Sequence, residues 1–542
     1  AFPLLMSAEN GHAIIVEHLL AALPKAERGE AVRQVNMQNG TFPLGMAAQN
    51  GHAEVVMVLL AVLPEDERSE AVQQCHENGL FSLLAAAQEG HAEAVERLLA
   101  ALSEAERGEA VQQCHDNGGF PLLMAAQEGH AEAVERLLAA LSEAERGEAV
   151  QQCHDNGGFP LLMAAQDGHA EVVAALLTAL PEAERGEAVR QVNEHKGTVP
   201  LLMAAQYGHA VVVEALLSAL AEAERGEAVR QVNEHKGTFP LLMAAQNGHL
   251  GVVERLLAAL SEAERGETVR QVNEHKGTVP LLMAAQNGQV GVVERLLAAL
   301  TEAERGETVR QVNEHKGTFP LLMSAQNGHA EVVKHLLAAI PEPERSEAVR
   351  QVAPVDGGFP LLMAAQNGHV EVVAALLAAV SEAERGETVR QVNEHKGTFP
   401  LLMAAQNGHF GVVERILAAL SEAERGETVR QVNEHKGTFP LLMAAGNGHG
   451  EVVQILINAG APLDQLSDRL GTALDPALAF GHWSLAAALQ TQGARCHHVR
   501  PIMDETGHLV SVDQTPTSRE FATCPLLLYR EADLHAFRAK TE

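Results

Sequence analysis

The sequence is poor in aromatic residues and in positive charge, and both shortages limit what the protein can be. Aromatic residues make up 3% of the 542 residues, with one Trp and two Tyr. Lys and Arg together number 39 against 71 Asp and Glu, which gives a formal net charge of −32. Because a nucleic-acid backbone or an anionic membrane is bound through basic surface, this balance argues against both as main partners.

Long hydrophobic runs and catalytic motifs are also missing from the sequence. No stretch approaches the roughly 20 consecutive apolar residues of a membrane-spanning helix. The hydrophobic fraction of 46% is nevertheless too high for a disordered chain. The sequence contains no P-loop, dinucleotide fingerprint, nucleophile elbow or HExxH motif. We therefore predict a protein that is neither a membrane protein nor an enzyme and that needs no cofactor.

What dominates the sequence is an internal repeat. A Gly-His pair recurs along the chain, with Gln in place of His after Gly288, at successive spacings of 40, three times 39, seven times 40, and 33 residues. Thirteen repeats therefore fill the chain to about residue 495. A repeat of this size cannot bury its apolar faces alone, so stacking of neighbours into one continuous core predicts a solenoid.

The repeat over residues 237–276, GTFPLLMAAQNGHLGVVERLLAALSEAERGETVRQVNEHK, predicts three helices. Pro240 suits a first helical position, and Gly248 suits a tight turn that ends the first helix. The apolar stripe from Val253 to Leu260 predicts a second, amphipathic helix. Ser261 followed by Glu264 fits a capping box, so we expect a third helix there, with Val269 and Val272 as its apolar edge.

The pattern G-T-F-P-L-L-M-A-A-Q-N-G-H-x-x-V-V-x-x-L-L resembles the ankyrin repeat, whose pattern is G-x-T-P-L-H-x-A-A-x-x-G-H followed by V-V and L-L. The last two repeats resemble the family most closely, through Leu456–Asp464, Thr472-Ala473-Leu474 and a return to the family's period of 33. The resemblance implies an all-α, ankyrin-like solenoid that binds a partner protein on its concave face.

The long repeats depart from the family pattern at three places. The family's Thr is Phe239 or Val279 here and its His is Leu242, so apolar packing should replace the polar network of those residues. The extra residues SEAERGEAVRQ stand where the family has a β-hairpin finger, and we interpret them as the third helix. Because a period near 40 with three helices also suits an armadillo-like fold, that fold is the alternative.

Three parts follow from this pattern: long ankyrin-like repeats over residues 1–447, terminal repeats of the usual length over 448–495, and a nonrepeating cap or tail over 496–542. In the tail, residues 502–512 around Glu505-Thr506-Gly507 predict a hairpin. Capping is the usual role of a nonrepeating end of a solenoid.

The candidate binding residues lie where the first helix of each repeat ends. By resemblance this place belongs to the concave, partner-facing side, and Asn and Gln there offer donors and acceptors to an extended chain. Tyr is a good interface anchor. The alternative is that all these residues are merely solvated helix ends. The predicted partner-binding residues are Glu89, Glu128, Asp167, Tyr207, Gln246, Asn247, Gln286, Asn287, Gln326, Asn327, Gln366 and Asn367.

The net charge of the repeats changes along the chain. Residues 119–157 hold seven acidic and two basic residues, a balance of −5, whereas residues 237–276 hold five and four, a balance of −1. The earlier repeats should attract a basic partner more strongly. Solubility of a long Ala-rich array is an equal explanation.

The histidines and cysteines invite a metal hypothesis, which the repeat spacing disfavours. His195, His235 and their equivalents should lie one helix layer, about 8–10 Å, apart, whereas zinc ligands each lie about 2.0–2.3 Å from one ion. Cys75, Cys114 and Cys153, one per layer, are too far apart for disulfides, which suits a reducing cytoplasm. Cys496-His497-His498 with Cys524 and His535 matches no metal motif, so we predict no metal site.

Our functional prediction is a non-catalytic scaffold that binds a partner protein, basic or extended in character. Arg outnumbers Lys by 30 to 9, which hints at a GC-rich, bacterial genome and at an effector delivered into a host cell or an inhibitor module. Two alternatives remain: a substrate-selecting array of a larger enzyme whose catalytic domain precedes residue 1, and an array that self-assembles.

Overall fold

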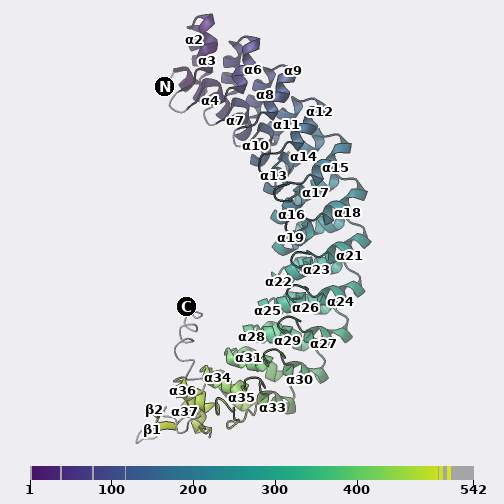
Figure 1. The fold of residues 1–542 in the computed structure, drawn as a ribbon, viewed down its shortest axis with the longest axis vertical. Coiled ribbons are helices and arrows are strands. Elements are labelled where there is room, and N and C mark those ends of the chain that lie inside the picture. The colour runs from purple at the N-terminus through teal and green to yellow at the C-terminus, as the bar shows by residue number, and fades with distance from the viewer. Residues whose placement is uncertain are drawn as a thin grey trace. The chain divides into compact units, whose positions relative to one another are not determined.

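The computed structural model describes residues 3–36, 40–75, 79–115 and 118–497, and the backbone of residues 500–503 and 509–513. The chain forms two compact units, a first unit of residues 1–275 and a second of residues 276–542, and each is described by itself. In both, the described repeats are stacks of short helices, as Figure 1 shows. The predicted all-α array with three helices per long repeat is confirmed.

The first unit holds seven complete three-helix repeats. The first helices are α1 Pro3–Glu9, α4 Pro43–Gln49, α7 Ser82–Gln88, α10 Pro121–Glu128, α13 Pro160–Asp167, α16 Pro200–Tyr207 and α19 Pro240–Asn247. The second helices are α2 Ala13–Ala21, α5 Ala53–Ala61, α8 Ala92–Ala100, α11 Ala131–Ala139, α14 Ala170–Ala179, α17 Ala210–Ser218 and α20 Leu250–Ala258. The third helices are α3 Lys25–Arg33, α6 Glu65–Gln73, α9 Glu104–Gln112, α12 Glu143–Gln151, α15 Glu182–Arg190, α18 Glu222–Arg230 and α21 Glu262–Arg270.

The second unit continues the same order of helices. Its first helices are α22 Pro280–Gln286, α25 Pro320–Asn327, α28 Pro360–Asn367, α31 Pro400–Gln406, α34 Pro440–Gly446 and α36 Leu474–Ala479. Its second helices are α23 Val290–Ala298, α26 Ala330–Ala339, α29 Val370–Ala379, α32 Phe410–Ala418, α35 Gly450–Asn458 and α37 Trp483–Thr491. Its third helices are α24 Glu302–Arg310, α27 Glu342–Arg350, α30 Glu382–Arg390 and α33 Glu422–Arg430.

The first and second helices form because, in each repeat, apolar residues stand within the helices and turn-forming residues stand at their ends. In α19, Pro240 occupies the first turn, where its missing N–H is no loss. Gly248 ends the helix with a left-handed backbone, φ 78°, that a side chain would strain. Phe239 and Leu242 are fully buried, so the expected replacement of the family's polar Thr and His by apolar packing is confirmed.

The third helix is attached to the second by polar contacts at its start. In α21, Ser261 and Glu264 form the predicted capping box, and Arg265 Nε donates to the Leu257 carbonyl at 2.8 Å. Arg265 also places a positive charge near the C-terminus of α20, where it compensates the negative end of the helix dipole. The prediction for Val272 was wrong: Val269 is buried, but Val272 follows the end of α21 and is 40% exposed.

Adjacent repeats are joined by three recurring side-chain to backbone hydrogen bonds. In the turn between the first and second helices, His209 Nε2 lies 2.9 Å from the Gln166 carbonyl oxygen of the preceding repeat. In the loop that follows the third helix, Asn233 Nδ2 donates to the Lys196 carbonyl of the preceding loop at 2.9 Å. At the end of the third helix, Gln271 Nε2 donates to the Arg230 carbonyl at 3.0 Å. Because these bonds recur between successive repeats, they help specify how one repeat sits on the next.

The last repeats differ from the others. Among the described residues no third helix lies between α35 and α36. Beyond α37, strands β1 Arg500–Met503 and β2 Leu509–Asp513 pair antiparallel, as the hairpin prediction required. Its turn, Glu505-Thr506-Gly507, lies outside the described residues. The division at residues 447 and 495 stays a prediction.

Candidate protein-binding surface

The acidic and aromatic candidates lie at equivalent places in consecutive repeats of the first unit. Glu89 caps α7, Glu128 ends α10, Asp167 ends α13 and Tyr207 ends α16. All four side chains are exposed. Placing a carboxylate at a helix C-terminus works against the helix dipole, which favours positive charge there. Helix stability therefore does not explain why three successive repeats carry an acid at this position.

Tyr207 is the most prominent aromatic residue of this surface. Its side chain is 49% exposed, and its ring stacks on His209 with centroids 6.4 Å apart. Val211, an outward-facing residue at the start of α17 just after the same turn, is 62% exposed. Val211 was not predicted from the sequence, although the signal was present: most other repeats have Glu or Gly at this outward position.

The Gln-Asn pairs are partly used to hold the repeats together. Asn247 Nδ2 donates to the Gln206 carbonyl of the preceding repeat at 2.8 Å. Three more bonds of this kind, from Asn327, Asn367 and Asn407, occur in the second unit. The paired residues Gln246, Gln286, Gln326 and Gln366 are half-buried, whereas Asn287, Asn327 and Asn367 are exposed. The amide nitrogens of Asn247, Asn327 and Asn367 each use one of their two N–H groups within the array, so these residues can still offer a partner one N–H donor and an acceptor oxygen.

A row of methionines on the first helices was not singled out from the sequence. Met124 and Met163, on α10 and α13, are half-buried and precede the helix-end acids by four residues. Residues three and four apart share one helix face, so these thioethers border the acidic side chains. Methionine adapts its shape to what it touches, which suits a binding surface.

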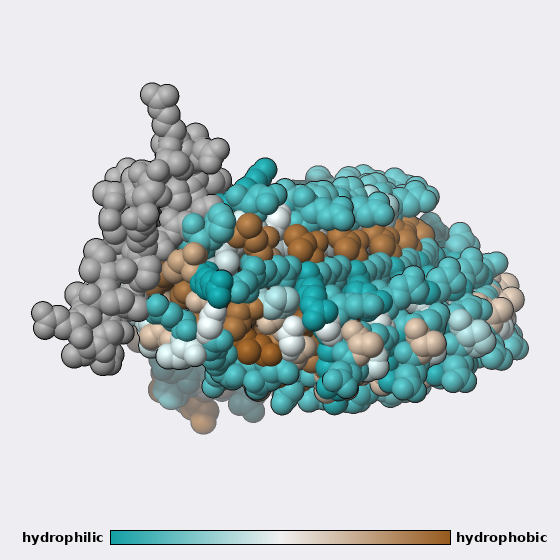
Figure 2. Space-filling model, turned by 90° about the horizontal axis from the view of Figure 1, so that it is seen from below, coloured by the Kyte–Doolittle hydropathy of each residue, from teal (hydrophilic) through white to brown (hydrophobic). Residues whose placement is uncertain are grey.

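A second exposed row lies after the third helices. Figure 2 shows hydrophobic side chains in a line bordered by hydrophilic ones. Among the residues that directly follow the third helices, the exposed valines are Val192, Val232 and Val272 in the first unit, and Val352, Val392 and Val432 in the second, whereas Val312 is half-buried. In three earlier repeats the equivalent residues are the exposed cysteines Cys75, Cys114 and Cys153, none of which forms a disulfide bond in the described part of the chain.

Metal and thiol chemistry receive little support from the geometry. Within the described part of the chain, no group of three or more His, Cys, Asp and Glu residues is arranged to hold a metal ion. Burial and the Asp475 carboxylate raise the pKa of Cys496 to about 12, so its thiolate is scarce near neutral pH. The other members of the candidate tail cluster, His498, Cys524 and His535, lie outside the described residues.

The stacked helices, left-handed glycine turns and connecting histidines define a helical repeat protein. The family model for ankyrin repeats matches in overlapping segments that together cover residues 4–499, so the chain belongs to the ankyrin repeat family. This match agrees with the ankyrin-like prediction over the armadillo-like alternative. A comparison with curated proteins found no match. No described helix combines the length and the hydropathy that crossing a membrane would require.

Proposed function

We propose that this protein is a non-catalytic scaffold that binds a basic segment of a partner protein along the ends of its first helices. Ankyrin repeats generally mediate protein–protein interaction and are typically not enzymes. The observation that carries the proposal is the exposed series Glu89, Glu128 and Asp167, followed by Tyr207, in four consecutive repeats.

Two physical arguments support a partner for this series. The carboxylates are placed where they cost helix stability, which is understandable if they serve binding. The repeat that carries Glu128 is also strongly acidic, with seven acidic and two basic residues over 119–157, so the local field would speed the approach of a basic chain. Tyr207 then supplies the large, rigid side chain that commonly anchors an interface.

The test uses a charge-reversed protein and a matched control. Proteins captured from bacterial and eukaryotic lysates are identified by mass spectrometry, and their affinity is then measured with purified components. The test variant is Glu89→Lys, Glu128→Lys and Asp167→Lys. The control is Glu109→Lys, Glu148→Lys and Glu187→Lys, which changes the net charge equally in the same three repeats but on the third helices α9, α12 and α15.

We expect the test variant to bind the partner at least tenfold more weakly than the wild type, with an affinity that depends much less on salt concentration. The control variant should retain most of the wild-type affinity and of its salt dependence. Tyr207→Ala should also weaken binding. Equal losses in the two charge-reversed proteins would show that only overall charge matters and would contradict the assignment of the surface.

The finer predictions concern biology that this surface alone does not identify. An effector or inhibitor role, a cytoplasmic location and delivery into a host cell stay predictions. Self-assembly is separated from scaffolding by light scattering, because a concentration-independent monomer mass contradicts it. The substrate-selecting alternative requires a catalytic domain in the open reading frame upstream of residue 1.

A further inference from the structure

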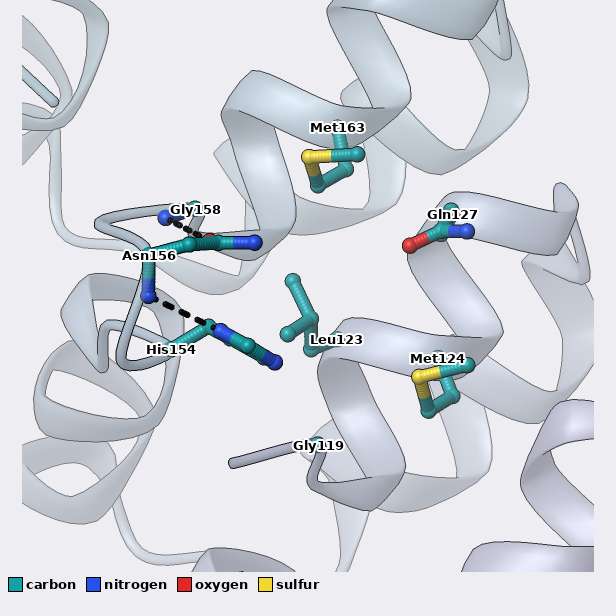
Figure 3. A pocket seen from close by; sticks show the side chains of 8 residues that line it. All are labelled: Gly119, Leu123, Met124, Gln127, His154, Asn156, Gly158 and Met163. Atoms are coloured by element: carbon teal, nitrogen blue, oxygen red, sulfur yellow. Dashed lines mark hydrogen bonds between the residues drawn. The ribbon is translucent and has the colours of Figure 1, made fainter. Parts of the chain in front are cut away.

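A small pocket opens in the first unit between α10 and α13, beside the acidic series. Its volume is about 200 Å³. Figure 3 shows that Leu123, Met124 and Gln127 of α10, His154 and Asn156 of the connecting loop, and Met163 of α13 line it. Pockets for drug-sized molecules measure roughly 300–1,000 Å³, so this one is suited to a single side chain.

The pocket exists because two loop positions lack side chains. Gly119 and Gly158 line it, whereas the equivalent residues of the following repeats are Thr198 and Thr238. Neither glycine has a positive φ, so neither backbone conformation requires glycine. A Cβ on Gly158 would lie 3.4 Å from Met163 Sδ, a wall of the pocket.

The lining combines apolar side chains with the polar side chains of Gln127, His154 and Asn156. Leu123, Met124 and Met163 present carbon and sulfur. His154 Nδ1 accepts a hydrogen bond from the Asn156 N–H at 3.0 Å, so in the neutral ring the proton resides on Nε2. Such a site can bury an aliphatic side chain and still hydrogen-bond to the chain that carries it.

The charged residues around the pocket indicate which charge a bound partner segment should carry. Glu128 directly follows Gln127, Asp155 lies between His154 and Asn156, and both are exposed. We propose that the pocket takes one aliphatic side chain, of the size of Leu, Ile or Met, from a basic partner segment whose Lys or Arg residues contact the acidic series. This inference rests on the proposed function and adds the anchor that gives the interaction its register.

A random dodecapeptide phage-display library, selected against the whole chain, supplies the probe. Recovered peptides should contain one aliphatic residue among Arg and Lys. In fluorescence anisotropy, changing that residue to Ala in the peptide should raise Kd about tenfold or more, as expected for losing a buried aliphatic side chain. Because this change leaves the protein untouched, folding cannot explain the result.

A matched pair of protein variants fills the pocket or its counterpart. Gly158→Thr places a side chain against Met163, and should weaken binding as much as the peptide change does. Gly358→Thr is the control: its Cβ would meet Asp356 Oδ1 at 3.1 Å and Met363 Sδ at 3.5 Å, nearly as in Gly158, where the Asn156 Oδ1 and Met163 Sδ distances are 3.0 and 3.4 Å. The control should bind as the wild type does.

The outcomes separate the pocket from the wider proposal. If the recovered peptides bind equally well after the Ala change and to Gly158→Thr, the pocket assignment is overturned. The proposed function still stands in that case if Glu89→Lys, Glu128→Lys and Asp167→Lys abolish binding. If no peptide is enriched, or if this charge reversal has no effect, both are overturned.

Discussion

The loops at residues 151–158 and 190–198 connect equivalent helices but close differently. In the shorter loop the Gly157 N–H bonds to the His154 carbonyl at 2.7 Å, which makes a four-residue turn. In the longer loop the Gly197 N–H bonds to the Asn193 carbonyl at 2.7 Å, which makes a five-residue turn. This extra residue accounts for the difference between repeats of 39 and 40 residues.

The side chain at the start of the turn has a different task in each loop. Asn193 Oδ1 accepts the N–H groups of His195 and Lys196, each at 3.0 Å, and its Nδ2 reaches the Asn156 carbonyl of the preceding loop at 3.3 Å. His154 Nδ1 accepts one N–H group, that of Asn156, and its ring lines the pocket. The Asn loops therefore join neighbouring repeats, whereas the shorter loop lines a pocket.

The largest expected effect comes from removing one of the joining asparagines. Asn233 is buried, accepts two backbone N–H groups and donates to the Lys196 carbonyl. Asn233→Ala should cost about 2–3 kcal/mol of local stability, because the His235 and Lys236 N–H groups and the Lys196 carbonyl all lose a hydrogen-bond partner. Hydrogen exchange of residues 231–238 measures the loss. His154→Ala should cost about 1 kcal/mol or less, and equal losses would contradict the comparison.

The next effect concerns the cap of the third helix, which also differs between repeats. Ser261 caps α21, whereas Ala221 stands at the same place before α18 and offers no hydroxyl. Ser261→Ala should cost about 1 kcal/mol, and Ala221→Ser should gain a similar amount. The measurement is hydrogen exchange in α21 and α18, with α20 and α17 as internal controls. A uniform change in all four helices would mean that the cap is not a local determinant.

A smaller effect is expected when the loop chemistry is exchanged. Thr238→Gly gives the longer loop the residue of the shorter one and should cost about 0.5–1 kcal/mol through added backbone freedom. Hydrogen exchange of the loop again reports the change. A gain in stability would show that Thr238 is strained, and that glycine is selected in the shorter loops for stability and not for the pocket.

The smallest effect is a pH dependence at the caps. The Ser261 hydroxyl and backbone N–H, which donate to the Glu264 carboxylate, hold the pKa of Glu264 below its ordinary value of 4.5, with Arg230 assisting. Since the folded pKa is the lower one, this stabilisation is present above about pH 4.5 and is lost as the pH falls through the folded value. A carboxyl NMR titration should show the pKa of Glu264 rising in Ser261→Ala. An unchanged titration would mean that the serine does not stabilise the carboxylate.

Much of the fold could be predicted from local pattern. Pro240 at a helix start, Gly248 at its end and the Ser261–Glu264 capping box act within a few residues of each other, and the structure contains each as expected. Val272 was misassigned because its apolar character agreed with the helix pattern, while the backbone leaves the helix two residues earlier. The candidate binding residues are exposed where expected, and their role in binding stays a prediction.

The repeat, its three helices and the ankyrin family could all be predicted from the sequence, because those features depend on spacing within about 40 residues and recur many times. The polar groups that join the repeats and the place where a pocket opens became visible in the three-dimensional structure alone. The Asn233–Lys196 and His209–Gln166 contacts join residues 37 and 43 positions apart. The pocket likewise needs the walls of two repeats at once. Such contacts depend on how one helix layer sits on the next, and no single repeat contains that information.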